Sequence, residues 1–355
     1  MIIFVFGTTA EAIKIAPLVL ELETLERDFT LLATGQQGTQ PENTLRLFGI
    51  KSEVKYLIYR AQPISSISEA TLWFLTGFLR IMFGSKARFF TSSNVNDFVI
   101  IHGDTLSTFL GLVLSIRFRK YLGHIEAGLR SHRLLHPFPE ELVRRIVGSF
   151  SNVNFSPSED AVFNLRHKRG ITINTYGNTA LDAMSHFNQS TLKESQESFC
   201  LVLLHRTELV RNSKLMKQTL QELGVLSKAI PVVMVQDYVS EDRMRNLVKE
   251  FPGITIIGKQ DFASFQTLLR TSSFVITDSG GLQEECAAIG KPCLVHRIAT
   301  ERSDGLGDNA LLSGCEKGQI LSFYNNYHSF EKPISVEKLR PTSIIVDSLR
   351  ELRVL

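Results

Sequence analysis

A turn of small residues follows a short apolar run in the second half of the sequence, and its residue types suit the binding of an anion. Residues 273–276 are largely apolar and β-branched, as in a buried parallel strand, and Ser279, Gly280 and Gly281 follow shortly after. Residues 282–289 then predict a helix. Free backbone N–H groups and the positive end of a helix dipole therefore meet at this turn, as they do in many phosphate sites. The alternative is an ordinary strand-to-helix turn in which glycine only relieves crowding.

Three carboxylates occupy positions from which they could transfer protons. Asp104 follows a predicted strand, although an N-cap role alone would also explain it. Glu126 comes shortly after His124, at the end of an otherwise apolar strand, so capping explains it less well. Glu140 opens a predicted helix, where the helix dipole favours an acidic residue without any catalytic role.

Basic side chains occur at similar positions. His205 stands next to Arg206 at the end of another predicted strand, where such a pair suits a phosphate or a leaving group. A satisfied surface pair is the alternative. Lys14 lies about one turn into the first predicted helix, where a solvated face is its simpler explanation. Polar residues at the ends of several strands in two predicted domains are nevertheless hard to explain by packing alone.

These residues need a scaffold that brings strand ends together, and the hydrophobic pattern predicts one. Strands are predicted at residues 2–6, 29–33, 53–58, 97–102, 121–125, 153–156 and 172–176, and again at 199–204, 231–236, 254–257, 274–277 and 293–295. Helices are predicted between them at residues 10–25, 41–48, 64–83, 108–118, 140–150, 158–166, 214–226, 241–250, 262–270 and 282–289. This alternation predicts an α/β fold with two doubly wound, Rossmann-like parallel-sheet domains that face a central cleft.

The polar segment at residues 188–197 is the best candidate for a domain boundary. We therefore expect an N-terminal Rossmann-like domain with the three carboxylates at residues 1–187. A C-terminal Rossmann-like domain with the anion-binding turn is expected at residues 188–335. Residues 336–355 are expected to form a C-terminal helix that packs back on the first domain.

The composition is that of an ordinary soluble globular protein. The chain has 355 residues, 43% of them hydrophobic and 21% charged, which suggests two domains. The net charge of +3 is too weak to argue for nucleic acid or for an anionic membrane. The four cysteines lack metal-ligand spacing and suit buried, reduced thiols, so we expect a cytoplasmic protein. Residues 72–83 are too short to cross a bilayer, and the N-terminus has no signal-peptide pattern.

Nine motifs, from the N-terminus to about residue 302, carry a resemblance to a known family. They are Gly7-Thr8-x-x-Glu11-Ala12-Ile13-Lys14-x-Ala16-Pro17, Thr34-Gly35-Gln36, Gly103-Asp104-Thr105, Gly123-His124-x-Glu126-Ala127-Gly128-Leu129-Arg130, Pro137-x-Pro139-Glu140-Glu141-x-x-Arg144, Gly177-Asn178-Thr179, His205-Arg206-x-Glu208, Thr277-Asp278-Ser279-Gly280-Gly281-x-Gln283-Glu284-Glu285 and Thr300-Glu301-Arg302. Because it carries these motifs in this order, the chain resembles the non-hydrolysing UDP-N-acetylglucosamine 2-epimerases, which share a two-domain, GT-B-like architecture.

The resemblance implies inversion at C2 of a UDP-HexNAc, of the type that converts UDP-GlcNAc to UDP-ManNAc. UDP leaves C1 as a base removes the C2 proton, and it adds again to the 2-acetamidoglucal after protonation on the other face. The resemblance assigns acid/base chemistry to Asp104, Glu126 and Glu140, and contact with the leaving diphosphate to His205. Further contacts with the substrate or with UDP are implied for Thr9, Lys14, Arg130, Arg144, Arg206, Ser279, Gly280, Gly281, Glu285 and Arg302.

The resemblance also implies a UDP-sugar substrate, a homodimer, and the use of no cofactor and no metal. No part of the pattern indicates a nucleic-acid or membrane partner. Two other functions fit the same architecture: a glycosyltransferase or hydrolysing sugar-nucleotide enzyme, and a catalytically weakened homologue that only binds UDP-sugars.

Several positions depart from the family pattern. Thr9 and Ala10 stand where the family has Arg-Pro, so a cation that normally reaches the substrate phosphates is absent. Gln37, Val143 and Leu209 replace a histidine and two asparagines of the family. These departures suggest a specialised branch with a different sugar, or weakened activity.

Overall fold

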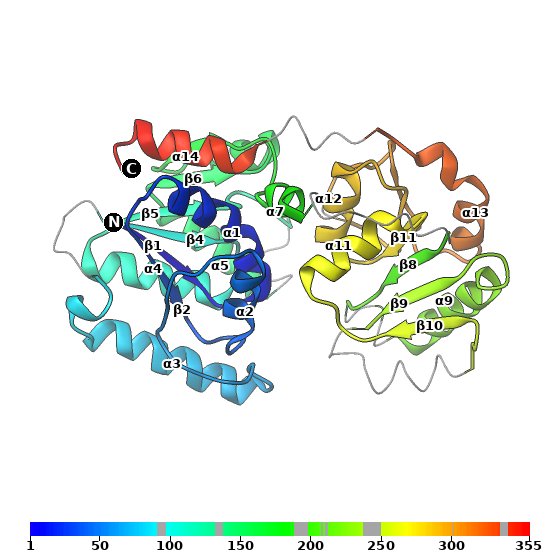
Figure 1. Ribbon diagram of the computed structural model, residues 1–355, viewed down its shortest axis with the longest axis horizontal. Coiled ribbons are helices and arrows are strands. Elements are labelled where there is room, and N and C mark those ends of the chain that lie inside the picture. Colours follow the sequence, from blue (N-terminus) through cyan, green and yellow to red (C-terminus); the bar gives the residue numbers. More distant parts are fainter. Residues whose placement is uncertain are drawn as a thin grey trace. The chain divides into compact units, whose positions relative to one another are not determined.

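The chain forms two compact units, which are drawn in the ribbon of the computed structural model in Figure 1. The structure describes residues 1–90, 97–131, 138–187, 198–206, 209, 212–236, 250–300, 302–333 and 340–355. The N-terminal unit comprises Met1–His186 with Leu339–Leu355, and the C-terminal unit comprises Phe187–Lys338. The predicted boundary at residues 188–197 and nearly all of the predicted helix at 241–250 lie outside the described residues.

The N-terminal unit is built on a parallel sheet of seven strands in the order β3-β2-β1-β4-β5-β6-β7. The strands are β1 (Ile2–Phe6), β2 (Phe29–Ala33), β3 (Val54–Tyr56), β4 (Phe98–His102), β5 (Tyr121–Ile125), β6 (Val153–Ser156) and β7 (Ile171–Asn174). β1 pairs with both β2 and β4, so the order of strands reverses there. Loops that leave the carboxyl ends of β1 and β4 therefore diverge, and such a switch point is where doubly wound sheets bind ligands.

Helices cover this sheet, and their starts follow local capping rules. They are α1 (Thr9–Thr24), α2 (Gln40–Leu47), α3 (Ile67–Phe83), the short 3-10 helix η1 (Lys86–Arg88), α4 (Leu106–Phe118), α5 (Glu140–Phe150), α6 (Glu159–Leu165), α7 (Ala180–His186) and α14 (Pro341–Glu351). Thr8 caps α1 in a capping box with Glu11, and Thr105 caps α4 in the same way with Thr108. Both caps lie at the carboxyl edge of the sheet, one after β1 and the other after β4.

The C-terminal unit repeats this plan with six parallel strands in the order β10-β9-β8-β11-β12-β13. Its strands are β8 (Cys200–Leu203), β9 (Val232–Val235), β10 (Ile254–Ile257), β11 (Phe274–Thr277), β12 (Cys293–Val295) and β13 (Ala310–Leu312). Its helices are α9 (Ser213–Leu226), α11 (Phe262–Thr271), α12 (Gly280–Ala288), α13 (Gln319–Asn326) and the 3-10 helix η4 (Tyr327–Phe330). The switch point of this sheet lies between β8 and β11.

The predicted fold class is confirmed, because both units are parallel α/β sheets. The sequence pattern missed the short elements β13, α7 and α13. It also placed the start of the helix after β11 too late, because Ser279 is the N-cap and Gly280 is already helical. Two consecutive glycines score poorly as helix formers, yet a first helical turn tolerates them.

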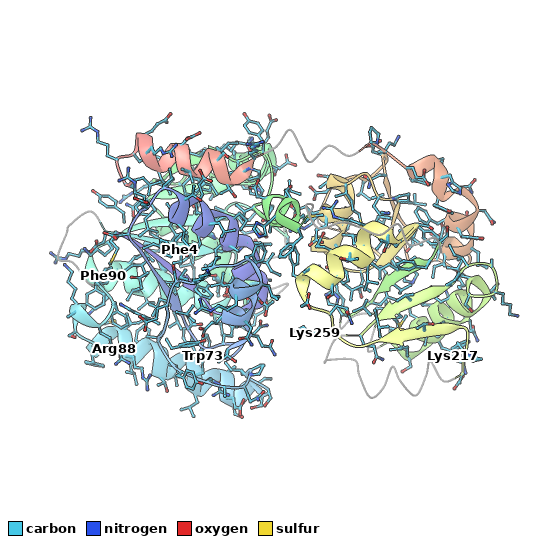
Figure 2. The ribbon with its side chains drawn as sticks, in the orientation of Figure 1. Phe4, Trp73, Arg88, Phe90, Lys217 and Lys259 are labelled. Atoms are coloured by element: carbon cyan, nitrogen blue, oxygen red, sulfur yellow. The ribbon has the colours of Figure 1, made fainter. Side chains whose placement is uncertain are left out.

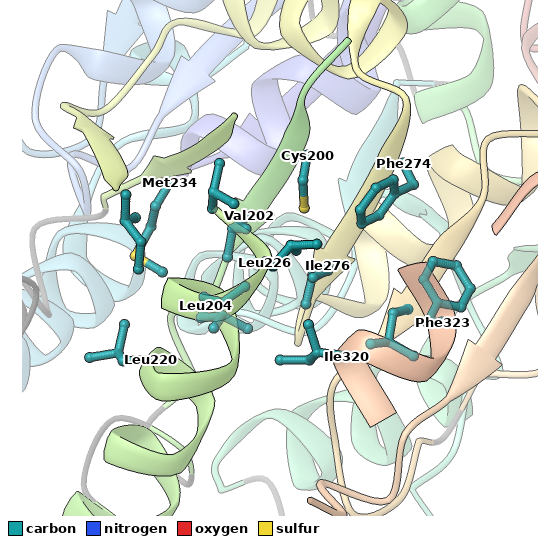
Figure 3. Close-up of a cluster of buried hydrophobic side chains, with 14 of the residues drawn as sticks. Cys200, Val202, Leu204, Leu220, Leu226, Met234, Phe274, Ile276, Ile320 and Phe323 are labelled. Atoms are coloured by element: carbon teal, nitrogen blue, oxygen red, sulfur yellow. The ribbon is translucent and has the colours of Figure 1, made fainter. Parts of the chain in front are cut away.

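Each unit has its own apolar core. In the N-terminal unit Phe4, Trp73 and Phe90 are all at least 97% buried, and Figure 2 shows where they lie in the ribbon. In the C-terminal unit Phe274 lies in a cluster of buried side chains shown in Figure 3. Its ring contacts that of Phe323 at a centroid distance of 5.9 Å. Within the described residues, no helix is both long and apolar enough to cross a membrane.

The last helix belongs to the N-terminal unit. α14 contacts α1 and α7, although more than 150 residues separate it from α7 along the chain. The carboxylate of Asp182 in α7 accepts hydrogen bonds from the backbone N–H of Thr342 at 2.7 Å and from its hydroxyl at 2.6 Å. Asp182 thus caps the start of α14 from another helix.

We predict that Asp182→Ala lowers the free energy of unfolding of the N-terminal unit by about 2 kcal/mol, because it removes two hydrogen bonds to a carboxylate. Urea unfolding followed by the fluorescence of Trp73, the one tryptophan of the chain, measures this unit. Asp28→Ala, in an exposed turn of the same unit, is the matched control. Equal stability of the Asp182 variant and the wild type would show that α14 is held by packing alone.

Candidate active site

Asp104 lies just beyond β4 and pairs with a guanidinium from α5. Arg144 donates through Nη2 to the Asp104 carboxylate in a close ion pair. Burial raises the pKa of Asp104, the positive charge of Arg144 opposes this shift, and the nearby Glu126 carboxylate adds to it. A carboxyl group whose pKa is raised can hold a proton at a higher pH than usual, which suits acid/base chemistry.

Glu126 lies just beyond β5 and is surrounded by polar groups from three other elements. Its Oε2 accepts a hydrogen bond from Lys14 Nζ of α1 and another from Asn178 Nδ2 at 2.6 Å. The Nε2 atom of His102, the last residue of β4, lies 3.3 Å from the same oxygen. Glu126 also has a φ of +63°, in the left-handed region that non-glycine residues rarely adopt. Such backbone strain is typical of functional sites, where the surrounding contacts fix a side chain in place.

Glu11 holds the loops after β1 and β4 together. Its buried carboxylate accepts hydrogen bonds from the backbone N–H groups of Gly7 at 2.7 Å and Thr8 at 2.9 Å. Across the switch point it also accepts from the hydroxyl groups of Thr105 at 2.7 Å and Thr108 at 3.2 Å. Burial raises the pKa of Glu11, and these hydrogen bonds oppose the shift.

Two histidines beneath the carboxylates are buried and neutral. Burial lowers the pKa of His102 to about 3 and that of His124 to about 4. The Nε2 atom of His124 lies 2.7 Å from the carbonyl oxygen of Gly103, so this nitrogen carries the proton. This hydrogen bond positions the loop that carries Asp104.

Acidic and basic side chains lie together in the first turns of α5. Glu140 is its first residue, and its Oε2 atom is buried without a hydrogen-bond partner among the described residues. The neighbouring Glu141 is fully buried and accepts from Arg144 at 3.2 Å and from Arg145 at 2.7 Å. Arg144 therefore joins Asp104 to Glu141. Arg130 donates to the carbonyl oxygen of Leu129 at 2.7 Å.

The first loop of the unit carries Thr9 at the position where the resemblance leads one to expect an arginine. Thr9 is the first residue of α1, and its backbone N–H donates to Gln37 Oε1 at 2.7 Å. The loop is thus tied to the one after β2, while the Thr9 side chain brings no charge to it.

In the C-terminal unit a buried carboxylate positions the loop after β8. The side chain of Asp278 accepts hydrogen bonds from the backbone N–H groups of His205 at 3.1 Å and Arg206 at 2.8 Å. The imidazole Nδ1 of His205 lies 3.6 Å from the same carboxylate. His205 and Arg206 thus lie beside the N-terminus of α12, at the switch point of this sheet.

The start of α12 is open to an approaching group. The hydroxyl of Ser279 accepts from the backbone N–H of Leu282 at 3.4 Å. Among the described residues, a Cβ atom added at Gly281 would meet only Ser279 Oγ, at 3.9 Å. Further along the helix Glu284 binds Arg302 at 2.7 Å and Glu285 accepts from Gln266 at 2.8 Å. Arg302 therefore neutralises a buried acid of α12 in this structure.

The predicted residues fall into two groups, one in each unit. The structure brings Asp104, Glu126, Lys14 and Arg144 together in the N-terminal unit, and the predicted residues of the C-terminal unit gather around α12. Within the described residues, no group of three or more His, Cys, Asp or Glu side chains could hold a metal ion. Pro137, Glu208 and Glu301 of the predicted motifs lie outside the described residues.

Sequence reasoning missed several residues of the first group. Asn178, His102 and Glu11 were not assigned a role, yet each contacts a candidate residue or holds its loop. Asn178 could have been found, because it follows β7 in a Gly-Asn-Thr motif at the same sheet edge. His102 gave no signal, since it occupies a buried strand position.

The two buried histidines each make a contribution to the stability of the N-terminal unit that is lost in acid. In the unfolded chain a histidine takes up a proton below about pH 6.5, whereas His124 in the folded unit stays neutral down to about pH 4. Stability is therefore lost as the pH falls from about 6.5 towards 4, at roughly 1.4 kcal/mol per pH unit for each histidine.

Urea unfolding followed by Trp73 fluorescence between pH 7.5 and pH 5 measures this slope. We expect His124→Asn to reduce the slope by about 1.4 kcal/mol per pH unit, whatever its effect at neutral pH. His167→Asn, at an exposed position of the same unit, is the matched control. An unchanged slope in the His124 variant would mean that this histidine takes up its proton at the same pH in the folded unit as in the unfolded chain.

Comparison with known proteins identifies the family. Residues 21–337 match the family model described as UDP-N-acetylglucosamine 2-epimerase. The chain is 30% identical to the UDP-N-acetylglucosamine 2-epimerase of Campylobacter jejuni over 90% of this chain and 87% of that protein. It is also 30% identical to the enzyme of the same name from Bacillus subtilis (strain 168), over 89% and 84% of the two chains.

Solved structures agree with the sequence match. A UDP-GlcNAc 2-epimerase from Neisseria meningitidis bound to UDP-GlcNAc superposes with a TM-score of 0.82, at 27% identity over 99% of each chain. MnaA of S. aureus bound to UDP gives the same TM-score and identity, over 100% of this chain and 97% of the other. The chain described here therefore belongs to the UDP-N-acetylglucosamine 2-epimerase family.

Proposed function

We propose that this protein is a non-hydrolysing UDP-HexNAc 2-epimerase, an isomerase that interconverts sugars of the UDP-GlcNAc and UDP-ManNAc type. The observation that carries the proposal is the convergence of Asp104 and Glu126 at neighbouring strand ends, each beside a cation, in a chain of this family. The bound UDP-GlcNAc and UDP of the two structural relatives support a UDP-sugar as the substrate.

The proposed reaction needs a base for a weakly acidic C–H bond. One carboxylate removes the C2 proton while the C1–O bond breaks and its electron pair leaves with UDP. A second acid returns a proton to the opposite face of the 2-acetamidoglucal, and UDP adds again at C1. Asp104, Glu126 and Glu140 are the proposed acid/base groups. The raised pKa of Asp104 supports its role as an acid/base group, because a carboxyl group with a raised pKa can hold a proton.

The leaving diphosphate needs positive charge and N–H donors. We assign this role to the start of α12 at Ser279, Gly280 and Gly281, together with His205 and Arg206. The open space at Gly281 and the anchored loop after β8 support the assignment. Lys14, Arg130 and Arg144, with Thr9, are proposed as substrate contacts from the N-terminal unit, and Glu285 and Arg302 as contacts from the C-terminal unit.

A homodimer and a cytoplasmic location complete the proposal. The helix α3 leaves Leu72, Leu75, Leu79 and Phe83 at least half exposed in one row, which a second copy of the chain could cover. All four cysteines are free thiols, as expected in a reducing compartment.

The isotope content of the product tests the reaction. If carboxylates exchange the proton at C2, the product formed from UDP-GlcNAc in D2O carries deuterium at C2, which NMR detects. We expect Asp104→Asn and Glu126→Gln to lower turnover by about 10²–10⁴-fold while UDP binding persists. Glu53→Gln, an exposed residue of the same unit, is the control.

Other outcomes identify the alternatives. A glycosyltransferase needs an acceptor and leaves C2 untouched, a hydrolysing enzyme releases free sugar, and a binding protein forms no product. Turnover of UDP-HexNAc with C2 fully protonated contradicts the proposed mechanism.

A second experiment tests the diphosphate site. Gly281→Val places a side chain in open space at the start of α12, so it should block an anion without disturbing the fold. We expect UDP to bind at least about tenfold more weakly, as measured by calorimetry, because a charge-assisted contact is lost. Gly258→Val is the matched control, at another glycine with open space in the same unit. Equal affinity in both variants would place the diphosphate elsewhere.

A further inference from the structure

The N-terminal unit has a cavity of about 480 Å³ whose lining includes neither Asp104 nor Glu126. It is lined by residues of α5 on one side and by the end of α6 on the other. A cavity of this size can hold a small molecule with several functional groups.

The charged residues of the lining all have basic side chains. They are Arg130, Arg145 and Lys168, with the imidazole of His167 beside them, and no carboxylate is among the described residues that line the cavity. Lys168 is exposed, and its ammonium group forms no ion pair within the described part of the chain. Two guanidinium groups and an ammonium group around one space favour an anion with several oxygen atoms.

The surrounding acids do not balance this charge. Glu141 is the carboxylate that pairs with Arg145, and it is shared with Arg144, which also pairs with Asp104. Arg130 interacts with the same carboxylate, and its partial burial lowers the pKa of its guanidinium. Two carboxylates, Glu141 and Asp104, thus serve three arginines, so a further anion would stabilise them.

The uncharged residues of the lining indicate the chemistry of the rest of the ligand. Ser149 and Asn164 provide polar groups beside the basic residues, and Ile146 and Phe150 provide an apolar wall. Phe150 is 62% exposed, although it is a large apolar side chain at the end of α5. An exposed ring next to a basic cavity suits a ligand with an organic body and an anionic end.

We propose that this cavity binds a phosphorylated small molecule, with its phosphate oxygens between Arg130, Arg145 and Lys168 and its organic part against Phe150. Of these residues only Arg130 is also assigned to the substrate in the proposed epimerase reaction, and the variants that test the cavity leave Arg130 unchanged. Binding can therefore be measured without turnover, and failure of one proposal leaves the other intact.

Inorganic diphosphate is the probe, and hydrogen–deuterium exchange with calorimetry is the measurement. Diphosphate is also expected at the start of α12, so the exchange data locate the cavity by slower exchange in α5 and at residues 164–168. We expect Lys168→Glu to abolish this protection and to weaken binding to the cavity by at least about tenfold. Lys51→Glu makes the same charge change at an exposed position of the same unit and should leave the protection intact.

Two results overturn the proposal. One is a lack of protection in α5 and residues 164–168 when diphosphate saturates the wild type. The other is equal protection in wild type and the Lys168→Glu variant, which would show that the anion does not contact this cavity. The double variant His167→Ala/Lys168→Ala repeats the test without adding a negative charge.

Discussion

A buried carboxylate at the switch point of each sheet is the constraint on which both candidate sites depend. In a parallel sheet the loops diverge where the order of strands reverses, and polar contacts are needed there to fix the loops relative to each other. Glu11 does this in the N-terminal unit by accepting from the loops after β1 and β4. Asp278 does the same in the C-terminal unit by accepting from the backbone after β8. Because each carboxylate is buried, water competes little for its hydrogen bonds. The loops are therefore fixed before any ligand binds.

The charges of the N-terminal site are arranged as pairs rather than as a single cluster. Lys14 faces Glu126, and Arg144 faces Asp104 while it also contacts Glu141. In the proposed reaction two carboxylates act on opposite faces of one carbon atom, so they must differ in their affinity for a proton at a given moment. Their different partners provide such a difference: an ammonium group and an amide next to Glu126, and a guanidinium next to Asp104. The neutral histidines beneath them add hydrogen-bonding groups without adding charge.

Much of the scaffold could be predicted from the sequence, because buried parallel strands read as short apolar runs between helical patterns. The strand ends then indicated where Asp104, Glu126 and His205 would lie. Contacts between distant segments could not be predicted in the same way. The pair Lys14–Glu126 joins residues 112 positions apart, and Asn178 reaches Glu126 from the loop between β7 and α7. The start of a helix was also missed at Gly280, because glycine is a poor helix former and hides the helical sequence pattern. The helix starts there because Ser279 caps it and because it packs in the unit.

The loss of the family's first-loop arginine can be understood from the same contacts. The loop that carries Thr9 is held by Glu11 through the backbone of Gly7 and Thr8, and by Gln37 through the backbone of Thr9 itself. None of these hydrogen bonds uses the side chain at position 9, so the loop can keep its shape with any residue there that retains a backbone N–H. The substitution therefore removes a positive charge while it leaves the geometry of the switch point in place. Its effect should fall on the binding of an anionic substrate rather than on folding.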